Sequence, residues 1–379
     1  MTSIGGASTG MVDWNLAVAT ATRLVRPGPE VSRDEARAVV AELRRHAKAS
    51  EVHVREFTRL GTEEGHDTPV LVVDRPGWIR ANVAGFREIL RPLLDKMQER
   101  RGTTTGGAVM SAVGGKVTGV ELGMLLSFLA SRVLGQYETF APAAGDLPSG
   151  GSPGAPGGGR LLLVAPNIVH VERELDVDPH DFRLWVCLHE ETHRTQFTAV
   201  PWLRDHLEGE IQSFLQETDV DPMTVLERVR EAAQSLAGGR PEAEEDDGGR
   251  SLVEIVQTPA QREILGRLTA VMSLLEGHAD FVMDGVGPDV VPTVGEIREK
   301  FQQRRAKGAS RLDLALRKLL GLDAKLRQYR DGERFVRAVF DEVGMDGFNR
   351  VWTSPNTLPT KSEIAKPADW VARVHRRAE

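Results

Sequence analysis

The stretch VDPHDFRLWVCLHEETHRTQF, from Val177 to Phe197, decides the fold of this chain. We expect a helix from about Pro179 to Phe197, because Asp178 is a good N-cap residue and proline suits the first helical position. Asp181 would lie in the first turn, where its negative charge is stabilised by the positive end of the helix dipole. Apolar residues and two histidines then recur at spacings of three and four, which predicts one mainly apolar face: Phe182, Trp185, Val186, His189 and His193.

The spacing of the two histidines indicates a metal site. His189 and His193 are four residues apart, so they stand one turn from each other on the same face and can converge on one Zn²⁺. Glu190 projects about 100° round the helix, where it misses the metal but can reach an attacking water. This is the H-E-x-x-H arrangement of zinc hydrolases. The alternatives are a structural or inactive metal site, and two histidines that coincide by chance.

A catalytic zinc usually takes three protein ligands, so one must come from elsewhere in the chain. The metzincin pattern would place a histidine six residues after His193, but Ala199 stands there. The segment LLEGHAD, from Leu274 to Asp280, offers a carboxylate instead. We expect Glu276 to be the third ligand and Asp280, on the same helical face, to hold the free N–H of a ligand histidine, most simply His189.

Other interpretations of this segment stay open. Glu276 and Asp280 could belong to a solvated helical face. His278 competes as the third ligand, and it is also a candidate catalytic donor to the developing oxyanion or a satisfied core histidine. Further donor candidates, none of them fixed by spacing, are Tyr137, Tyr329 and Arg194.

Composition limits the class of protein. The chain has 379 residues, of which 40% are apolar and 27% charged, and this balance is ordinary for a globular protein. A net charge of −7 argues against non-specific nucleic-acid binding. The single cysteine, Cys187, and the small polar residues before Gly10 favour a cytoplasmic protein. The apolar stretch 106–134 contains Lys116, Glu121 and Arg132, so we expect no membrane span.

Most of the chain is expected to be helical, with a small β element. We expect a mostly helical region over 1–144, a Gly/Pro-rich linker over 145–159 and a catalytic region over 160–379, with an acidic mobile loop at 238–250. Strands are expected at Val70–Val73 and, as a strand pair or one long edge strand, at Arg160–Val171. Apolar periodicity predicts helices at 32–50, 78–97, 120–134, 208–216, 222–236, 259–283, 294–304, 311–320 and 331–343.

Several longer blocks resemble a known family. They include VREFT at Val54–Thr58, DRPGWIRAN at Asp74–Asn82, LGQYE at Leu134–Glu138, the Val177–Phe197 block, LLEGHADFVMDGVGP at Leu274–Pro288, LLGLDAKLRQY at Leu319–Tyr329 and VGMDGFNRVW at Val343–Trp352. With them the chain resembles the zincin-like metallopeptidases, a bacterial family once catalogued as a domain of unknown function. Within that family it is most similar to the branch described as coenzyme F420 biosynthesis-associated.

The resemblance implies a mainly α zincin-like metalloprotease fold, a Zn²⁺ cofactor and a site on His189, Glu190 and His193, with Glu276 mapped as the third ligand. It leaves three functions to separate. The first is a metallopeptidase acting on a peptide or amide bond, and the second a metal hydrolase acting on a small metabolite. The third is an inactive zincin-like binding protein linked to coenzyme F420 metabolism, against which the intact Glu190 argues.

Overall fold

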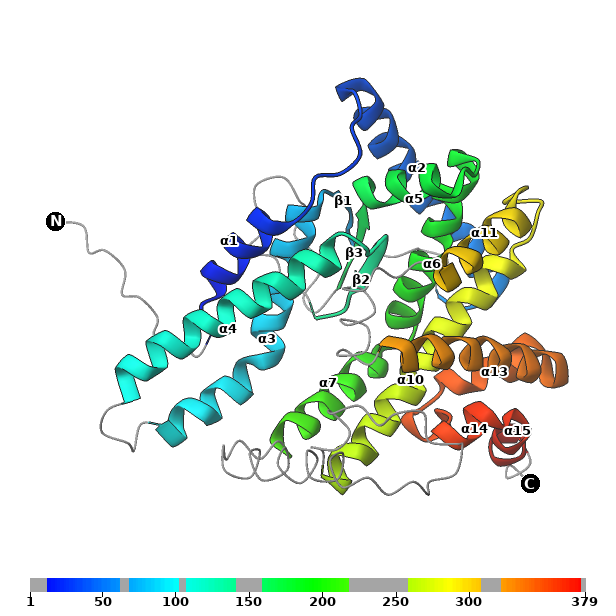
Figure 1. Cartoon of the computed structure of the whole chain (residues 1–379). Helices are drawn as coiled ribbons and strands as arrows, with labels where there is room; N and C mark the ends of the chain where they lie inside the picture. The colour runs from blue at the N-terminus through cyan, green and yellow to red at the C-terminus, as the bar shows by residue number, and fades with distance from the viewer. Residues whose placement is uncertain are drawn as a thin grey trace, which may run out of the picture. The chain divides into compact units, whose positions relative to one another are not determined.

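The computed structural model describes residues 12–61, 68–101, 107–140, 159–217, 258–307 and 322–375. They divide into two compact units, one formed by the residues up to 199 with 282–301, and the other by 200–281 with the residues from 302 onward. Figure 1 labels the elements. In chain order they are α1 (Trp14–Leu24), α2 (Arg33–Thr58), β1 (Val70–Val73), α3 (Arg75–Arg101), α4 (Gly107–Ala130), β2 (Gly135–Glu138), β3 (Arg160–Val164), α5 (Ala165–Leu175), α6 (Pro179–Ala199), α7 (Pro201–Gln216), α10 (Pro259–Gly285), α11 (Val294–Lys307), α13 (Leu322–Phe348), the 3₁₀ turns η1 (Asn349–Trp352) and η2 (Pro355–Thr357), α14 (Lys361–Ala365) and α15 (Pro367–His375).

A three-stranded sheet forms the centre of the first unit, in the order β1-β3-β2. β1 runs parallel to β3, with Val70 opposite Leu161, and β2 runs antiparallel to it, with Gly135 opposite Leu163. All five residues of β3 are buried, as expected for a strand paired on both sides and covered on both faces.

Helices cover both faces of this sheet. Successive residues of β3 point to opposite faces, and since those after Arg160 are apolar, each face has to be covered. Leu162 and Val164 pack into a core with α1, α3 and α4, whereas Leu163 packs into a core with α2, α5 and α6. Figure 1 shows α3 and α4 on one side of the sheet and α6 on the other. Burial of each such leucine contributes about 2 kcal/mol to folding. The sheet therefore gives α6 a rigid support.

The second unit is helical in its described part. Its core includes Phe335 and Trp370, whose rings meet edge to face with centroids 5.8 Å apart. The Trp370 indole N–H also donates to the Thr357 carbonyl oxygen at 2.8 Å, which ties α15 to the end of η2. No helix in the described part of either unit combines the length and apolarity that a membrane crossing requires.

The expected fold class, mainly α with a small β element, is confirmed. The strand at Val70–Val73 and the helix beginning at Pro179 have the expected positions. The expected strand over Arg160–Val171 is wrong beyond Val164, where α5 begins with Pro166 in its first turn. β3 is also the central strand, so the edge lies at β1 and β2 instead.

Two expected helices, 222–236 and 311–320, lie outside the described residues, as do the acidic loop at 238–250 and all of the expected linker except Gly159. The other expected helices are present, most of them longer than the periodicity indicated. The short helices α1, α5, α14 and α15 and the strand β2 were not predicted from the sequence.

Candidate metal centre

Helix α6 begins as its sequence predicts. The Asp178 carboxylate accepts a hydrogen bond from the Asp181 backbone N–H at 2.9 Å, which is the N-cap contact. Asp181 has a further role that the sequence did not reveal. Its carboxylate accepts hydrogen bonds from the backbone N–H and the hydroxyl of Thr293, at 2.9 and 2.7 Å. The first turn of α6 is therefore fixed to the segment that leads into α11.

The two histidines of the motif present their ring nitrogens to each other. The Nε2 atoms of His189 and His193 are 3.3 Å apart, and the ring planes are nearly perpendicular, at 88°. Two imidazole nitrogens bound tetrahedrally to one Zn²⁺ at about 2.0–2.1 Å would lie about 3.3 Å apart. Both side chains are half-buried, whereas most of α6 between Asp181 and Gln196 is buried. The pair therefore fits a zinc ion in spacing and in accessibility.

A glutamine orients one of these rings. The Nδ1 atom of His193 lies 2.9 Å from the Gln196 side-chain oxygen, three residues further along α6. Because that oxygen only accepts hydrogen bonds, this contact places the ring proton on Nδ1 and leaves the lone pair on Nε2 for a metal. Sequence reasoning did not identify Gln196, although its i+3 spacing from His193 could have indicated it.

Glu190 lies beside the edge strand β2. Its side chain is close to the Gly135 backbone: a Cβ atom at position 135 would lie 2.5 Å from Glu190 Cγ and 2.8 Å from its Oε1. Only 7% of Glu190 is exposed. A glycine at the start of β2 therefore makes room for this carboxylate, which was not expected from the sequence.

The next residue of the motif, Glu191, belongs to a buried charge cluster. Burial, reinforced by nearby Glu51, raises the pKa of Glu191 to about 8, although the Arg194 guanidinium acts in the opposite direction. Arg194 contacts the carboxylates of Glu191 at 3.1 Å and Glu51 at 2.8 Å. Arg194 is thus held inside the first unit, so a role as oxyanion donor has no support. Tyr137 and Tyr329 are the other two candidate oxyanion donors. The Tyr137 ring stacks on the Phe197 ring, with centroids 5.5 Å apart, and the Tyr329 side chain is not among the described side chains.

The remaining expected site residues lie on α10, in the second unit. Between Ser273 and Met283 the half-buried residues are Glu276 and Asp280, and the others are buried. These two carboxylates therefore share the one accessible face of this helix segment, as their spacing predicted. His278 is fully buried, and its ring packs against Phe348 at 5.2 Å and Trp352 at 5.4 Å. This environment is that of a core histidine.

Two comparisons found known proteins that are similar to this chain. The family model described as zincin-like metallopeptidase matches residues 12–371. A crystal structure from Chloroflexus aurantiacus, described provisionally as a hydrolase with a novel fold, is similar to this chain with a TM-score of 0.66 and 30% sequence identity. The alignment covers 97% of this chain and 99% of that one. No curated protein matches the chain.

Proposed function

Since the chain belongs to the zincin-like metallopeptidase family, we propose that it is a zinc-dependent hydrolase that cleaves a peptide or amide bond at a site built on α6. One observation carries the proposal: the Nε2 atoms of His189 and His193 are 3.3 Å apart, next to a carboxylate on the same helix. The family relationship supports a zinc hydrolase, and the arrangement on α6 supports the assignment of roles.

We assign three protein ligands to the zinc, namely His189, His193 and Glu276. Two histidines and one glutamate are a donor set that catalytic zinc uses, and such a set leaves one position for substrate or water. Glu276 is favoured over His278 because it lies on the accessible face of α10, whereas His278 packs among aromatic rings in a core. Asp280, one turn after Glu276, is proposed to orient a ligand histidine, most simply His189.

Glu190 is proposed as the general base. Bound zinc would supply a Lewis acid that favours ionisation of water near neutral pH and polarises the carbonyl group of the substrate. Glu190 accepts a proton from the water molecule as its oxygen bonds to the carbonyl carbon. Glu190 then passes this proton to the leaving nitrogen as the carbon–nitrogen bond breaks. The proposal assigns no step to His278.

The edge strand favours a peptide over a small metabolite as substrate. β2 pairs with β3 on one side only among the described residues, and its first residue lies against Glu190. An extended chain can add to such a strand edge through backbone hydrogen bonds. A peptide bound along β2 would therefore pass beside the proposed base. β3 cannot take this role, because it is paired on both sides, with β1 and with β2.

The test combines metal analysis with digestion of a peptide library by the purified chain. We expect about one zinc ion at this site and cleavage by the unmodified chain. The Glu190→Gln variant should keep its zinc and lose turnover by several orders of magnitude, because the amide cannot accept the proton. The His189→Ala and His193→Ala variants should lose this zinc. Glu263→Gln, an exposed position on α10, is the matched control and should behave as the unmodified chain.

Two results would refute this assignment. Full hydrolysis by Glu190→Gln would exclude Glu190 as the base, and full zinc affinity in His189→Ala would exclude the metal site. The third ligand has its own test. Glu276→Gln should weaken zinc binding by more than the roughly 10–100-fold that a ligand-orienting partner contributes, whereas Asp280→Asn should stay within that range. Equal effects of the two variants would count against Glu276 as a ligand.

A further inference from the structure

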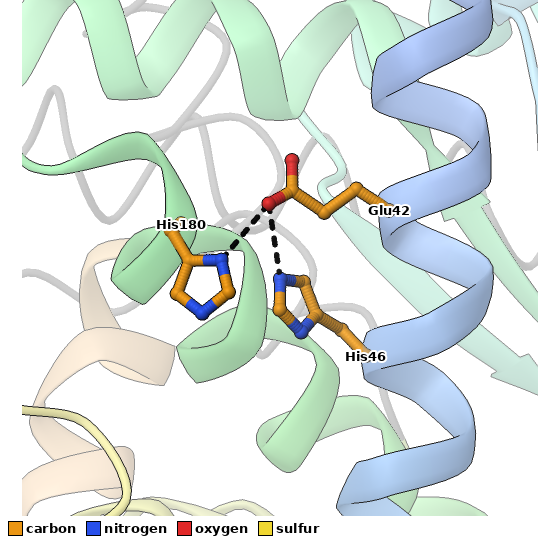
Figure 2. Close-up of side chains that lie close together, drawn as sticks. All are labelled: Glu42, His46 and His180. Atoms are coloured by element: carbon orange, nitrogen blue, oxygen red, sulfur yellow. Dashed lines mark hydrogen bonds and ion pairs between the residues drawn. The ribbon is translucent and has the colours of Figure 1, made fainter.

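A second group of potential metal ligands lies in the first unit, between α2 and the start of α6. Glu42 and His46 are one turn apart on α2, and His180 is the second residue of α6. Figure 2 shows the two imidazole rings facing the same carboxylate oxygen. Glu42 Oε1 lies 3.0 Å from His180 Nδ1 and 3.5 Å from His46 Nε2. One ligand atom from each residue falls within 4.8 Å of the others.

His46 is the member whose environment points to a ligand. It is only 7% exposed, and its Nε2 atom has no hydrogen-bond partner among the described residues. The distance of 3.5 Å to Glu42 Oε1 is too long for a good hydrogen bond. A buried nitrogen whose one polar contact is this long is poorly satisfied, and native structures seldom leave a buried polar atom so without a reason. This nitrogen points toward two other metal-ligating atoms.

Charged side chains surround the Glu42 carboxylate. The second oxygen of Glu42 contacts Arg183, whose Nε atom also donates to Glu172 at 2.9 Å. Arg173 is a further positive charge near Glu172, and Arg45 is one near His46. These groups therefore leave no excess of negative charge around the site. Glu42 nevertheless keeps one oxygen, Oε1, directed at the two imidazoles, so that one carboxylate ligand atom faces both rings.

We propose that Glu42, His46 and His180 bind a divalent transition-metal ion of the zinc type that fastens the first turn of α6 to α2. Two imidazoles and one carboxylate are a ligand set that suits zinc. His180 has a side-chain exposure of 63%, so the ion would be accessible to solvent and a water molecule can complete its coordination. The role is structural, because the ion would hold the helix that carries His189 and His193 nine residues before the first of them.

This ion is independent of the proposed catalytic zinc, and the experiment separates the two. The metal-free His189→Ala/His193→Ala chain is titrated with Zn²⁺ by calorimetry, and its metal content is measured after gel filtration. We expect one ion per chain and a rise in melting temperature on zinc addition. Adding His180→Ala or Glu42→Gln should abolish both. His170→Ala is the matched control, because His170 is also exposed and lies 3.8 Å from a carboxylate, that of Glu174.

A second measurement covers the case in which the double variant does not fold. In the otherwise unmodified chain, His180→Ala should remove one ion per chain, and His170→Ala should remove none. Retention of the remaining ion and of hydrolysis by His180→Ala would show that the proposed catalytic site is intact. The proposal is overturned if His180→Ala and Glu42→Gln bind as many ions, with the same affinity, as their parent chains.

Discussion

Gly135 of β2 and Glu190 of α6 are in such close contact that no side chain fits between them. The Cβ atom of an alanine at position 135 would lie 2.5 Å from Glu190 Cγ, closer than real Cβ contacts occur. The backbone of the edge strand therefore sets the position of the proposed base. A change at Gly135 should act on chemistry without touching any metal ligand.

The first prediction follows from this contact. Gly135→Ala should displace Glu190 and lower kcat by about 100-fold, because small misplacements of a catalytic group cost about that much. Zinc content should stay at the level of the unmodified chain. The measurements are peptide turnover and metal analysis. Gly209→Ala is the control, since nothing lies within 4 Å of a Cβ atom there. Unchanged turnover in Gly135→Ala would show that the base is not positioned by β2.

The second prediction concerns the contact between α10 and α13. A Cβ atom on Gly277 would lie 2.1 Å from the carbonyl carbon of Gly332, and neither backbone can yield as a flexible side chain would. Gly277→Ala should therefore destabilise the second unit by roughly 1–3 kcal/mol or more. Gly266→Ala, on the same helix with nothing within 4 Å, should be neutral or stabilising by up to about 1 kcal/mol. Urea unfolding of both variants gives the comparison, and equal stability would contradict the close helix contact.

The third prediction concerns pH and the C-terminal helices. Burial alone would raise the pKa of Glu363, but hydrogen bonds from Arg373 and from the Thr360 backbone outweigh burial and hold the pKa below its ordinary value of 4.5. Two of these bonds are 2.6 and 2.8 Å long. A depressed pKa in the folded state means that the ionised carboxylate stabilises the fold fully above pH 4.5. This contribution disappears as the pH falls through the folded-state pKa.

The corresponding variant is Glu363→Gln. It should be less stable than the unmodified chain by about 1.5 kcal/mol at pH 7, because an amide cannot replace the ion pair. The difference should shrink as the pH is lowered from 5 toward 3.5. Urea unfolding at several pH values measures it. If the difference in unfolding free energy stays constant over this range, the ionised form of Glu363 does not stabilise the fold.

The fourth prediction concerns Cys187, which is fully buried on α6. Burial, together with the neighbouring Glu190, Glu191 and Glu42 carboxylates, raises the pKa of this thiol well above its usual value. The folded chain should therefore resist thiol reagents at pH 8, and modification should follow unfolding in urea. Mass spectrometry after a timed reaction measures it. Rapid labelling of the folded chain would show that α6 opens locally.

The helix that carries the proposed metal ligands could be predicted because its signals are local. The N-cap Asp178, the proline after it and the i, i+4 spacing of His189 and His193 all lie within one helix, and a helix fixes the geometry of residues four apart. The shared face of Glu276 and Asp280 could be predicted for the same reason. Relations within one helix do not depend on how the rest of the chain folds.

The segment after Arg160 shows why other parts could not be predicted. RLLLV and the residues that follow alternate enough to indicate a strand pair or one long edge strand. Pro166 instead lies in the first turn of a helix, and the burial of Ile168, Val169 and Val171 is helical. A proline in the first helical turn was the signal that could have located this boundary. Both contacts that matter most here, Gly135 with Glu190 and Glu42 with His180, join segments far apart in sequence. Periodicity carries no information about such pairs.

The parallel pairing of β1 with β3 joins Val70 to Leu161 across about ninety residues of chain. Closing so long a loop costs entropy before any contact across it is formed, so this step should be slow compared with formation of the helices. During synthesis from the N-terminus, β1 has to wait until the ribosome has released β3, and α6 follows after the short helix α5. The sheet is therefore complete before α6 is synthesised, so the helix that carries the proposed ligands meets a finished support as it forms.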